Sequence, residues 1–182
     1  LADKLTHYVI RSGVVPEQAY EIYQYGFQIG IEMSFCFAIS LGIAVYLHMI
    51  PEFIVFITIF ILLRTYVGGL HMESFWTCTL CSVIVQTAAL LFSSWYQFHL
   101  LWAWSIIFIC SGMILWLSPI ENFNRELEEI EKRHCKKVTL KVIIGIVLFS
   151  WYCMVVKDEK KVSLIAVTLL VVLGSQYAGK IK

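Results

Sequence analysis

The sequence predicts an all-α, polytopic helical membrane protein with about six transmembrane helices, and three observations carry this prediction. The chain of 182 residues is 59% hydrophobic and only 15% charged, whereas soluble domains average roughly 45–50% apolar and about 25% charged residues. Its apolar residues are grouped into blocks of about 20 residues, the length that a helix needs to cross a bilayer. The stretch from Ser74 to Ile120 contains no Lys, Arg, Asp or Glu.

The chain is predicted to be one integral membrane domain, in which an amphipathic region at residues 1–26 precedes a transmembrane bundle at residues 27–178. A break at residues 13–16 divides the N-terminal region into two short helices, the second starting at Glu17. The region is too polar for the hydrophobic segment of a cleaved signal peptide, and we expect it to lie at the membrane interface. The apolar face of its first helix consists of Leu5, Tyr8 and Val9.

Six segments are long enough and apolar enough to cross a membrane. Pro51 is expected to end the first, and Arg64, near the end of the short second segment, is expected to snorkel to the surface. The third and fourth segments form an uncharged hairpin, and a charged turn separates the last two. The segments are Phe27 to Ile50, Phe53 to Val67, Ser74 to Trp95, Leu100 to Leu117, Val138 to Val156 and Val162 to Tyr177.

An even number of spans puts both ends of the predicted bundle on one side of the membrane. If that side is the cytoplasm, eleven of the fourteen Lys and Arg residues face it, and only the three lysines of residues 157–161 lie outside. The positive-inside rule favours this orientation. Much of the inside charge belongs to a predicted solvated connector helix before the fifth span, where Glu128 and Lys132, and Glu129 and Arg133, have the i,i+4 spacing of ion pairs.

Charge and cysteine usage argue against two classes of protein. A net charge of +1 and the lack of a Lys/Arg-rich run argue against nucleic-acid binding. Six cysteines are present, but five lie inside or near the start of apolar segments, and Cys135 alone lies in a charged loop. That distribution is unlike the disulfide framework of a small secreted protein.

A cluster of ionisable and small residues lies between the second and third spans. Ionisable groups are costly at a membrane and therefore point to function. The pair Gly68-Gly69 breaks the second span, and Cys78 follows near the start of the third. The helix macrodipole, Arg64 and His71 would each favour the Cys78 thiolate. The cluster consists of Arg64, Gly68, Gly69, His71, Glu73 and Cys78.

The spacing of His71 and Cys78 limits how the two residues can act together. On one continuous helix, residues seven apart are about 10 Å apart along the axis, which is too far for the roughly 3 Å contact between a nucleophile and its base. The Gly-Gly loop must therefore fold His71 back over the start of the third span, whose candidate N-cap is Ser74. His71 could then take the thiol proton and return it to a leaving amine, with Glu73 as a candidate to orient the imidazole.

The cluster reads R-x-x-x-G-G-x-H-x-x-x-x-x-x-C, and this pattern resembles the motif of the accessory gene regulator B family. These are bacterial membrane cysteine endopeptidases that process quorum-sensing peptide precursors. The segment Ser118 to Asn124 also resembles the family's proline-containing turn, and the resemblance covers nearly the whole chain. Met72 stands where members often carry a small residue, which bears on substrate choice. By this resemblance His71 and Cys78 are the catalytic pair.

The resemblance implies a specific activity in the bacterial cell membrane, with the active site at the cytoplasmic face. Cys78 would form an acyl-enzyme thioester with an autoinducer precursor, and an internal Cys or Ser of the peptide would then close a thiolactone or lactone. The implied partners are a precursor carrying a membrane-bound amphipathic helix, membrane lipid, and a second copy in a homodimer. Small residues such as Gly42 and Ala44 could allow close contact between copies. Neither a cofactor nor a metal is expected.

Three other interpretations of the same residues stay open. Cys78 and Cys81 form a C-x-x-C pattern typical of a membrane thiol-disulfide oxidoreductase, although the polar loops offer only Cys135 as a further thiol. Together with His71 and Glu73 they have the ligand types of a zinc site, but the seven-residue gap is unusual for one. The third interpretation is a non-enzymatic transporter or scaffold, although the spans contain no inverted repeat of broken helices.

Overall fold

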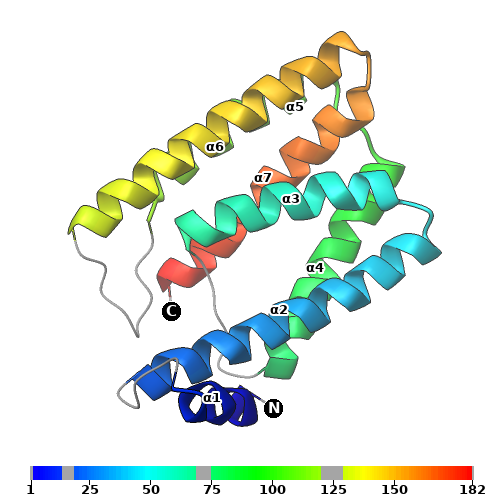
Figure 1. The fold of residues 1–182 in the computed structure, drawn as a ribbon. Helices are drawn as coiled ribbons and strands as arrows, with labels where there is room; N and C mark the ends of the chain where they lie inside the picture. The colour runs from blue at the N-terminus through cyan, green and yellow to red at the C-terminus, as the bar shows by residue number, and fades with distance from the viewer. Residues whose placement is uncertain (1, 14–18, 69–74, 120–128, 182) are drawn as a thin grey trace.

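The computed structural model describes residues 2–13, 19–68, 75–119 and 129–181 of the chain. Within these residues the chain forms seven α-helices and no β-strand, so the all-α prediction is confirmed. Six of these helices are long and apolar enough to cross a membrane. In chain order (Figure 1) the helices are α1 (Ala2–Arg11), α2 (Tyr20–Tyr46), α3 (Ile50–Val67), α4 (Phe75–Trp95), α5 (Leu100–Leu117), α6 (Glu129–Val155) and α7 (Glu159–Ile181).

The six long helices alternate in direction, and short turns join them in pairs. These turns lie at residues 47–49, 96–99 and 156–158, and Figure 1 shows all three at the same end of the bundle. We call this the turn end. The opposite end, which we call the site end, holds the start of α2, the end of α3 and the start of α4, together with the end of α5, the start of α6 and the C-terminus.

Pro51 begins α3, so the prediction that it ends the preceding span is wrong. α2 stops at Tyr46, and the chain reverses through His48, which has a φ of 56°. α3 then starts at Ile50 with Pro51 in its first turn. Proline suits that position because its φ is already helical and its missing N–H would have no intrahelical acceptor. With Pro51 and Glu52 included, α3 is 18 residues long and can span a membrane by itself.

The other predicted spans agree at their apolar centres and differ at their polar ends. α5 has the predicted bounds, whereas α2 begins at Tyr20, inside the predicted N-terminal region. α6 begins at Glu129, so the predicted connector helix is not separate but continuous with the fifth span. Its first turn contains an ion pair between Lys132 Nζ and Glu129 Oε1 at 3.5 Å. Glu128, a predicted partner of Lys132, lies outside the described residues.

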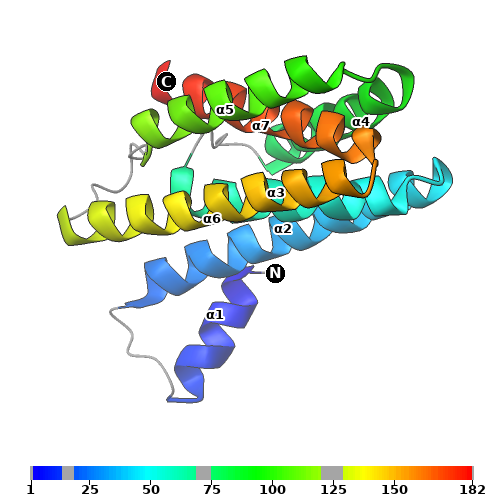
Figure 2. The ribbon, with the colours of Figure 1, turned by 90° about the horizontal axis from the view of Figure 1, so that it is seen from above.

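α7 is the central helix of the bundle. It packs against α3, α4, α5 and α6, and Figure 2 shows it running between α5 on one side and α3 and α6 on the other. Every residue from Val162 to Leu169 is buried. Because successive residues of an α-helix are about 100° apart, such a run covers the full circumference, so this part of α7 is enclosed by its neighbours. Leu63, Ile107 and Ile146 belong to the same apolar core.

The outer surface of the bundle is apolar, as expected where lipid replaces water. Large apolar side chains such as Phe108 are exposed along the middle of the helices. Exposed aromatic residues lie at the helix ends, Tyr46 and Trp95 at the turn end and Trp76 and Trp116 at the site end. Aromatic residues gather at both membrane–water interfaces in membrane proteins. These features, with the six long apolar helices, describe a multi-pass membrane protein.

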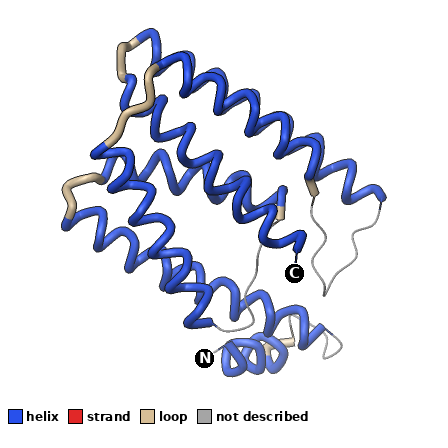
Figure 3. Tube along the Cα trace, turned by 180° about the vertical axis from the view of Figure 1, so that it is seen from behind, coloured by secondary structure: helices blue, strands red, loops and turns tan. Residues whose placement is uncertain are grey.

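α1 lies against the first part of α2 at the edge of the bundle, as the view from behind in Figure 3 shows. The Tyr20 hydroxyl donates a hydrogen bond to the Asp3 carboxylate, and the ring centroids of His7 and Tyr20 are 5.3 Å apart. Leu5 and Tyr8 stay exposed. The first of the two predicted N-terminal helices is therefore confirmed, and part of its apolar face is free of the bundle. The second is not a separate short helix, because the residues from Tyr20 onward belong to α2.

Candidate functional site

The predicted cluster lies at the site end, where α3 stops and α4 begins. Arg64 is in the last turn of α3, Gly68 is its C-cap, and Cys78 is the fourth residue of α4. Gly69, His71 and Glu73 lie in residues 69–74, outside the described part of the chain, as does the predicted N-cap Ser74. The contact between His71 and Cys78 therefore stays a prediction.

Gly68 ends α3 in a backbone conformation that is almost restricted to glycine. Its φ is 78° and its ψ is −164°, and its amide nitrogen donates to the Arg64 carbonyl oxygen at 3.3 Å. A side chain would be strained in this region of φ/ψ space. The sequence predicted that the glycine pair breaks the second span, and the structure confirms the break at its first glycine.

The Arg64 side chain interacts with two other helices of the bundle. Its Nη1 atom donates a hydrogen bond to Ser175 Oγ on α7 at 3.2 Å, and Ser175 in turn donates to the Val172 carbonyl oxygen at 2.9 Å. Arg64 is also close enough to Cys78 on α4 for an electrostatic interaction. The half-buried guanidinium thus connects α3 with α7 and α4. The sequence had instead predicted that Arg64 snorkels to the membrane surface.

Cys78 is a half-exposed thiol at the start of α4 that forms no disulfide. The first N–H groups of a helix lack intrahelical acceptors, and their partial positive charge favours an anion. Arg64 adds a full positive charge from α3. Two effects therefore favour the thiolate that a nucleophilic cysteine needs. By contrast, Cys110 and Cys153 are buried in the apolar core, an environment in which a thiol is unreactive.

Cys81, the second cysteine of the C-x-x-C pattern, is an exposed free thiol one turn further along α4. In the described part of the chain, no group of three or more His, Cys, Asp or Glu side chains is placed to hold a metal ion. Because His71 and Glu73 of the possible zinc set lie outside that part, the zinc interpretation stays a prediction. The oxidoreductase interpretation also stays a prediction, since neither Cys78 nor Cys81 forms a disulfide here.

A row of polar side chains lies between α2 and α4, and the sequence predicted no function for it. Glu32, Cys36 and Ser40 follow one another at four-residue intervals on one face of α2, and Glu32 and Ser40 are buried. The Cys36 thiol interacts with the Ser82 hydroxyl of α4, and Thr79 of α4 is buried as well. The sequence held one signal for this row, since Glu32 is the one charged residue in the predicted first span.

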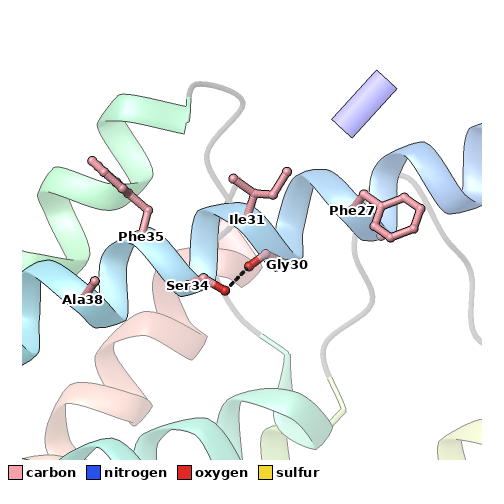
Figure 4. A pocket seen from close by; sticks show the side chains of 7 residues that line it. Phe27, Gly30, Ile31, Ser34, Phe35 and Ala38 are labelled. Atoms are coloured by element: carbon pink, nitrogen blue, oxygen red, sulfur yellow. Dashed lines mark hydrogen bonds between the residues drawn. The ribbon is translucent and has the colours of Figure 1, made fainter. Parts of the chain in front are cut away.

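A shallow hollow of about 570 Å³ on α2 borders the start of α4. Small residues at four-residue intervals between positions 26 and 38 create it, and Figure 4 shows Ser34 Oγ donating to the Gly30 carbonyl oxygen at 2.8 Å. Phe35, which also lines the hollow, meets Trp76 of α4 edge-on with ring centroids 6.2 Å apart. Among the described residues that line the hollow, none has a titratable side chain.

Comparisons with known proteins agree with the motif and the fold. The sequence model of the Accessory gene regulator B family matches residues 2–176. The chain belongs to this family. It is similar to a putative AgrB-like protein of Halalkalibacterium halodurans, with 28% identity over 116 residues, which make up 64% of this chain and 57% of the relative. No solved structure matches.

The family match confirms the resemblance predicted from the motif, and the matched residues include Arg64, Gly68 and Cys78. Accessory gene regulator B proteins are associated with the processing of quorum-sensing peptides. The match covers less than two thirds of the relative's length.

Proposed function

We propose that this chain is a membrane-embedded cysteine endopeptidase that cleaves an autoinducer precursor peptide and promotes its cyclisation. The observation that carries the proposal is the placement of Cys78, a half-exposed thiol that forms no disulfide, at a helix start where it interacts electrostatically with the Arg64 guanidinium from another helix. Membership of a family associated with peptide processing supports the choice of substrate.

In the first step the Cys78 thiolate attacks a carbonyl carbon of the precursor. The C–N bond breaks, and His71, having taken the thiol proton, gives it to the departing amine. The product is an acyl-enzyme thioester on Cys78. Because α3 ends at Gly68, the chain leaves the α3 helix before His71, as the proposed contact with Cys78 requires.

In the second step an internal thiol or hydroxyl of the bound peptide attacks the thioester carbonyl. A thiolactone or lactone forms, the C–S bond to Cys78 breaks, and the thiolate is regenerated. Water must be excluded while the thioester persists, because hydrolysis would release a linear peptide. The partial burial of Cys78 supports this requirement, since it limits the access of water to one side of the thiol.

We place this site at the cytoplasmic face of the bacterial cell membrane. The site end also carries Lys132, Arg133 and Lys136, which follow the acidic first turn of α6, and Lys180 in the last turn of α7. This charge distribution supports a cytoplasmic site end under the positive-inside rule. A cysteine introduced at Glu159 should react with a membrane-impermeant thiol reagent on whole cells, and one at Lys136 should not; the opposite pattern would reverse the orientation.

A homodimer is part of the proposal, and the structure narrows which residues could support it. Ala44, expected to permit close contact between copies, is fully buried against Phe53 and Phe56 and cannot touch a second copy. Gly42 is exposed, and an added side chain there would meet no neighbouring atom. Close packing between copies would therefore use the Gly42 face of α2. Light scattering of the solubilised protein measures the mass of the particle and so distinguishes a dimer from a monomer.

The proposed function is tested by precursor cleavage in membranes that carry variants of the two α4 cysteines. The substrate to be assayed is a short precursor peptide with an amphipathic N-terminal helix and an internal Cys or Ser. Cys78→Ala should lower cleavage at least about 10³-fold while the protein still inserts, because the nucleophile is lost. Cys81→Ala is the matched control and should stay within about twofold of the wild type. Full cleavage by Cys78→Ala would refute the peptidase.

The same assay separates the other interpretations of the cluster. Equal loss of activity in Cys78→Ala and Cys81→Ala, with consumption of a quinone, would favour a thiol-disulfide oxidoreductase. Loss of activity on chelation would favour the zinc site. Transport of the peptide without cleavage would favour the transporter.

A further inference from the structure

Glu32 is a buried side chain that the proposed mechanism does not use. It lies on α2 with 7% of its surface exposed, and its Oε1 atom has no hydrogen-bond partner in the described part of the chain. A buried polar atom without a partner is destabilising, and more so in a carboxyl group. Such groups are rare in folded proteins, and a ligand that supplies the missing partner is one explanation for them.

Glu32 and Cys78 lie on the same side of the contact between α2 and α4. That contact includes the interaction of the Cys36 thiol with the Ser82 hydroxyl. α2 and α4 both run from the site end toward the turn end (Figure 1). Glu32 precedes Cys36 by one helical turn, and Cys78 precedes Ser82 by one turn. Both residues are therefore displaced from the contact toward the site end.

Thr79 adds a second unpartnered polar atom next to Cys78. It follows Cys78 directly in α4, is 4% exposed, and its Oγ1 atom has no hydrogen-bond partner among the described residues. A carboxyl oxygen accepts hydrogen bonds, and a hydroxyl both donates and accepts them. An extended peptide presents complementary N–H and C=O groups at every residue. The two side chains thus match what a peptide would offer beside the nucleophile.

We propose that Glu32 and Thr79 form a subsite for the precursor peptide next to the bond that Cys78 attacks. Glu32 Oε1 accepts a hydrogen bond from an N–H donor of the peptide, which is either a backbone amide or a basic side chain. This inference rests on the proposed peptidase function. Binding at this point holds the scissile carbonyl near the thiolate, and the low dielectric of the membrane interior strengthens the contact.

The test measures binding of a fluorescent precursor to full-length Cys78→Ala protein in lipid nanodiscs, together with steady-state cleavage by protein that keeps Cys78. Glu32→Leu should weaken binding and raise KM roughly tenfold or more, with kcat within about threefold, because a charged hydrogen bond is lost. Thr79→Val should raise KM by a smaller factor. Glu32→Gln keeps an acceptor oxygen without the charge and identifies the donor. Near wild-type affinity indicates a backbone amide, and a loss equal to that of Glu32→Leu indicates a basic side chain.

Ser40→Ala is the matched control, because Ser40 is also buried on the same face of α2 but lies two turns further from the site end. It should leave affinity and KM unchanged. Wild-type affinity in Glu32→Leu would overturn the subsite, and so would an equal loss of affinity in Ser40→Ala. Precursor that binds tightly but is never cleaved by the wild-type protein would overturn the proposed function and leave the subsite standing.

Discussion

The two ends of the bundle place their charged side chains in different ways. At the turn end, Asp158 accepts a hydrogen bond from the Lys161 backbone nitrogen at 3.2 Å and pairs with the Lys161 ammonium at 2.6 Å. This contact joins residues three apart and stabilises the start of α7. At the site end, Arg64 of α3 instead interacts with Ser175 of α7 and Cys78 of α4. At the turn end, charge stabilises a local turn. At the site end, the charge of a residue on α3 acts on a thiol of α4.

This difference predicts that substitutions at the two ends have separable effects. Changes at the turn end should alter the free energy of unfolding and leave Cys78 reactivity unchanged. Side-chain changes at the site end that leave the backbone unstrained should alter Cys78 reactivity more than stability. The following four comparisons test that separation, beginning with the largest expected effect.

Arg64→Ala should slow alkylation of Cys78 by iodoacetamide at neutral pH roughly tenfold or more, because a cation beside the sulfur favours the thiolate. Arg64→Lys keeps a positive charge and should lose less. The rates are measured by mass spectrometry in protein whose other cysteines are replaced. Equal rates in wild type and Arg64→Ala would show that the helix start alone activates the thiol, and cleavage assays would then test Arg64 for a role in binding the peptide.

Gly68→Ala should lower the free energy of unfolding by about 1–3 kcal/mol, because alanine is strained at a φ of 78° and a ψ of −164°. It should also reduce cleavage by misdirecting the chain after α3. Gly42→Ala is the matched control. Gly42 lies inside a helix, and a methyl group added there would contact no neighbouring atom. Alanine stabilises a helix relative to glycine by about 1 kcal/mol, so this variant should not be destabilised. Thermal melting in detergent measures the stability of both variants. An equal change of stability in Gly68→Ala and Gly42→Ala would contradict the strain assigned to Gly68.

Ser175→Ala should slow Cys78 alkylation about two- to fivefold, because Arg64 loses a hydrogen bond that positions its guanidinium. Ser163→Ala is the matched control on the same helix. Ser163 Oγ accepts a hydrogen bond from the Phe98 backbone nitrogen at 3.0 Å at the turn end, so its loss should lower stability only. The comparison fails if Ser163→Ala slows alkylation as much as Ser175→Ala does.

Asp158→Asn should have the smallest effect, a loss of about 0.5–1 kcal/mol of stability at neutral pH. The hydrogen bond from Lys161 holds the pKa of Asp158 below its ordinary value of 3.8. The stabilisation is therefore fully present above pH 3.8 and is lost as the pH falls below it through the lowered pKa. Melting curves of wild type and variant should converge in that acidic range, while alkylation of Cys78 at neutral pH stays the same. A stability difference that persisted at low pH would assign the effect to another cause.

The apolar pattern predicted the number, order and centres of the spans, but not their ends. Hydrophobicity marks the part of a helix inside lipid, and α6 extends past that part into charged residues from Glu129. A proline does not by itself locate a helix boundary, because it can follow the end of one helix or lie in the first turn of the next, as Pro51 does in α3. These boundaries depend on hydrogen bonds and turn geometry, which hydropathy does not record.

The motif predicted the residues of the site but not the partners that hold them. Arg64, Gly68 and Cys78 are close together in the sequence, so their spacing could be recognised as a motif without the fold. Ser175 lies on α7, and its hydrogen bond to Arg64 depends on how α7 packs in the centre of the bundle. The burial of Glu32 likewise depends on the packing of α2 against α4. Contacts between distant segments require the fold.

The central claim is that Cys78 carries the peptide as a thioester, and intact-protein mass spectrometry tests it most directly. Wild-type protein mixed with the precursor and quenched in acid should gain the mass of the acyl fragment on the α4 segment that contains Cys78. Hydroxylamine should remove that mass, because it cleaves thioesters. Cys78→Ala should gain no such mass, and Cys81→Ala should gain it as the wild type does. Precursor cleavage by the wild type with no hydroxylamine-sensitive adduct on Cys78, or the same adduct in Cys78→Ala, would contradict the account.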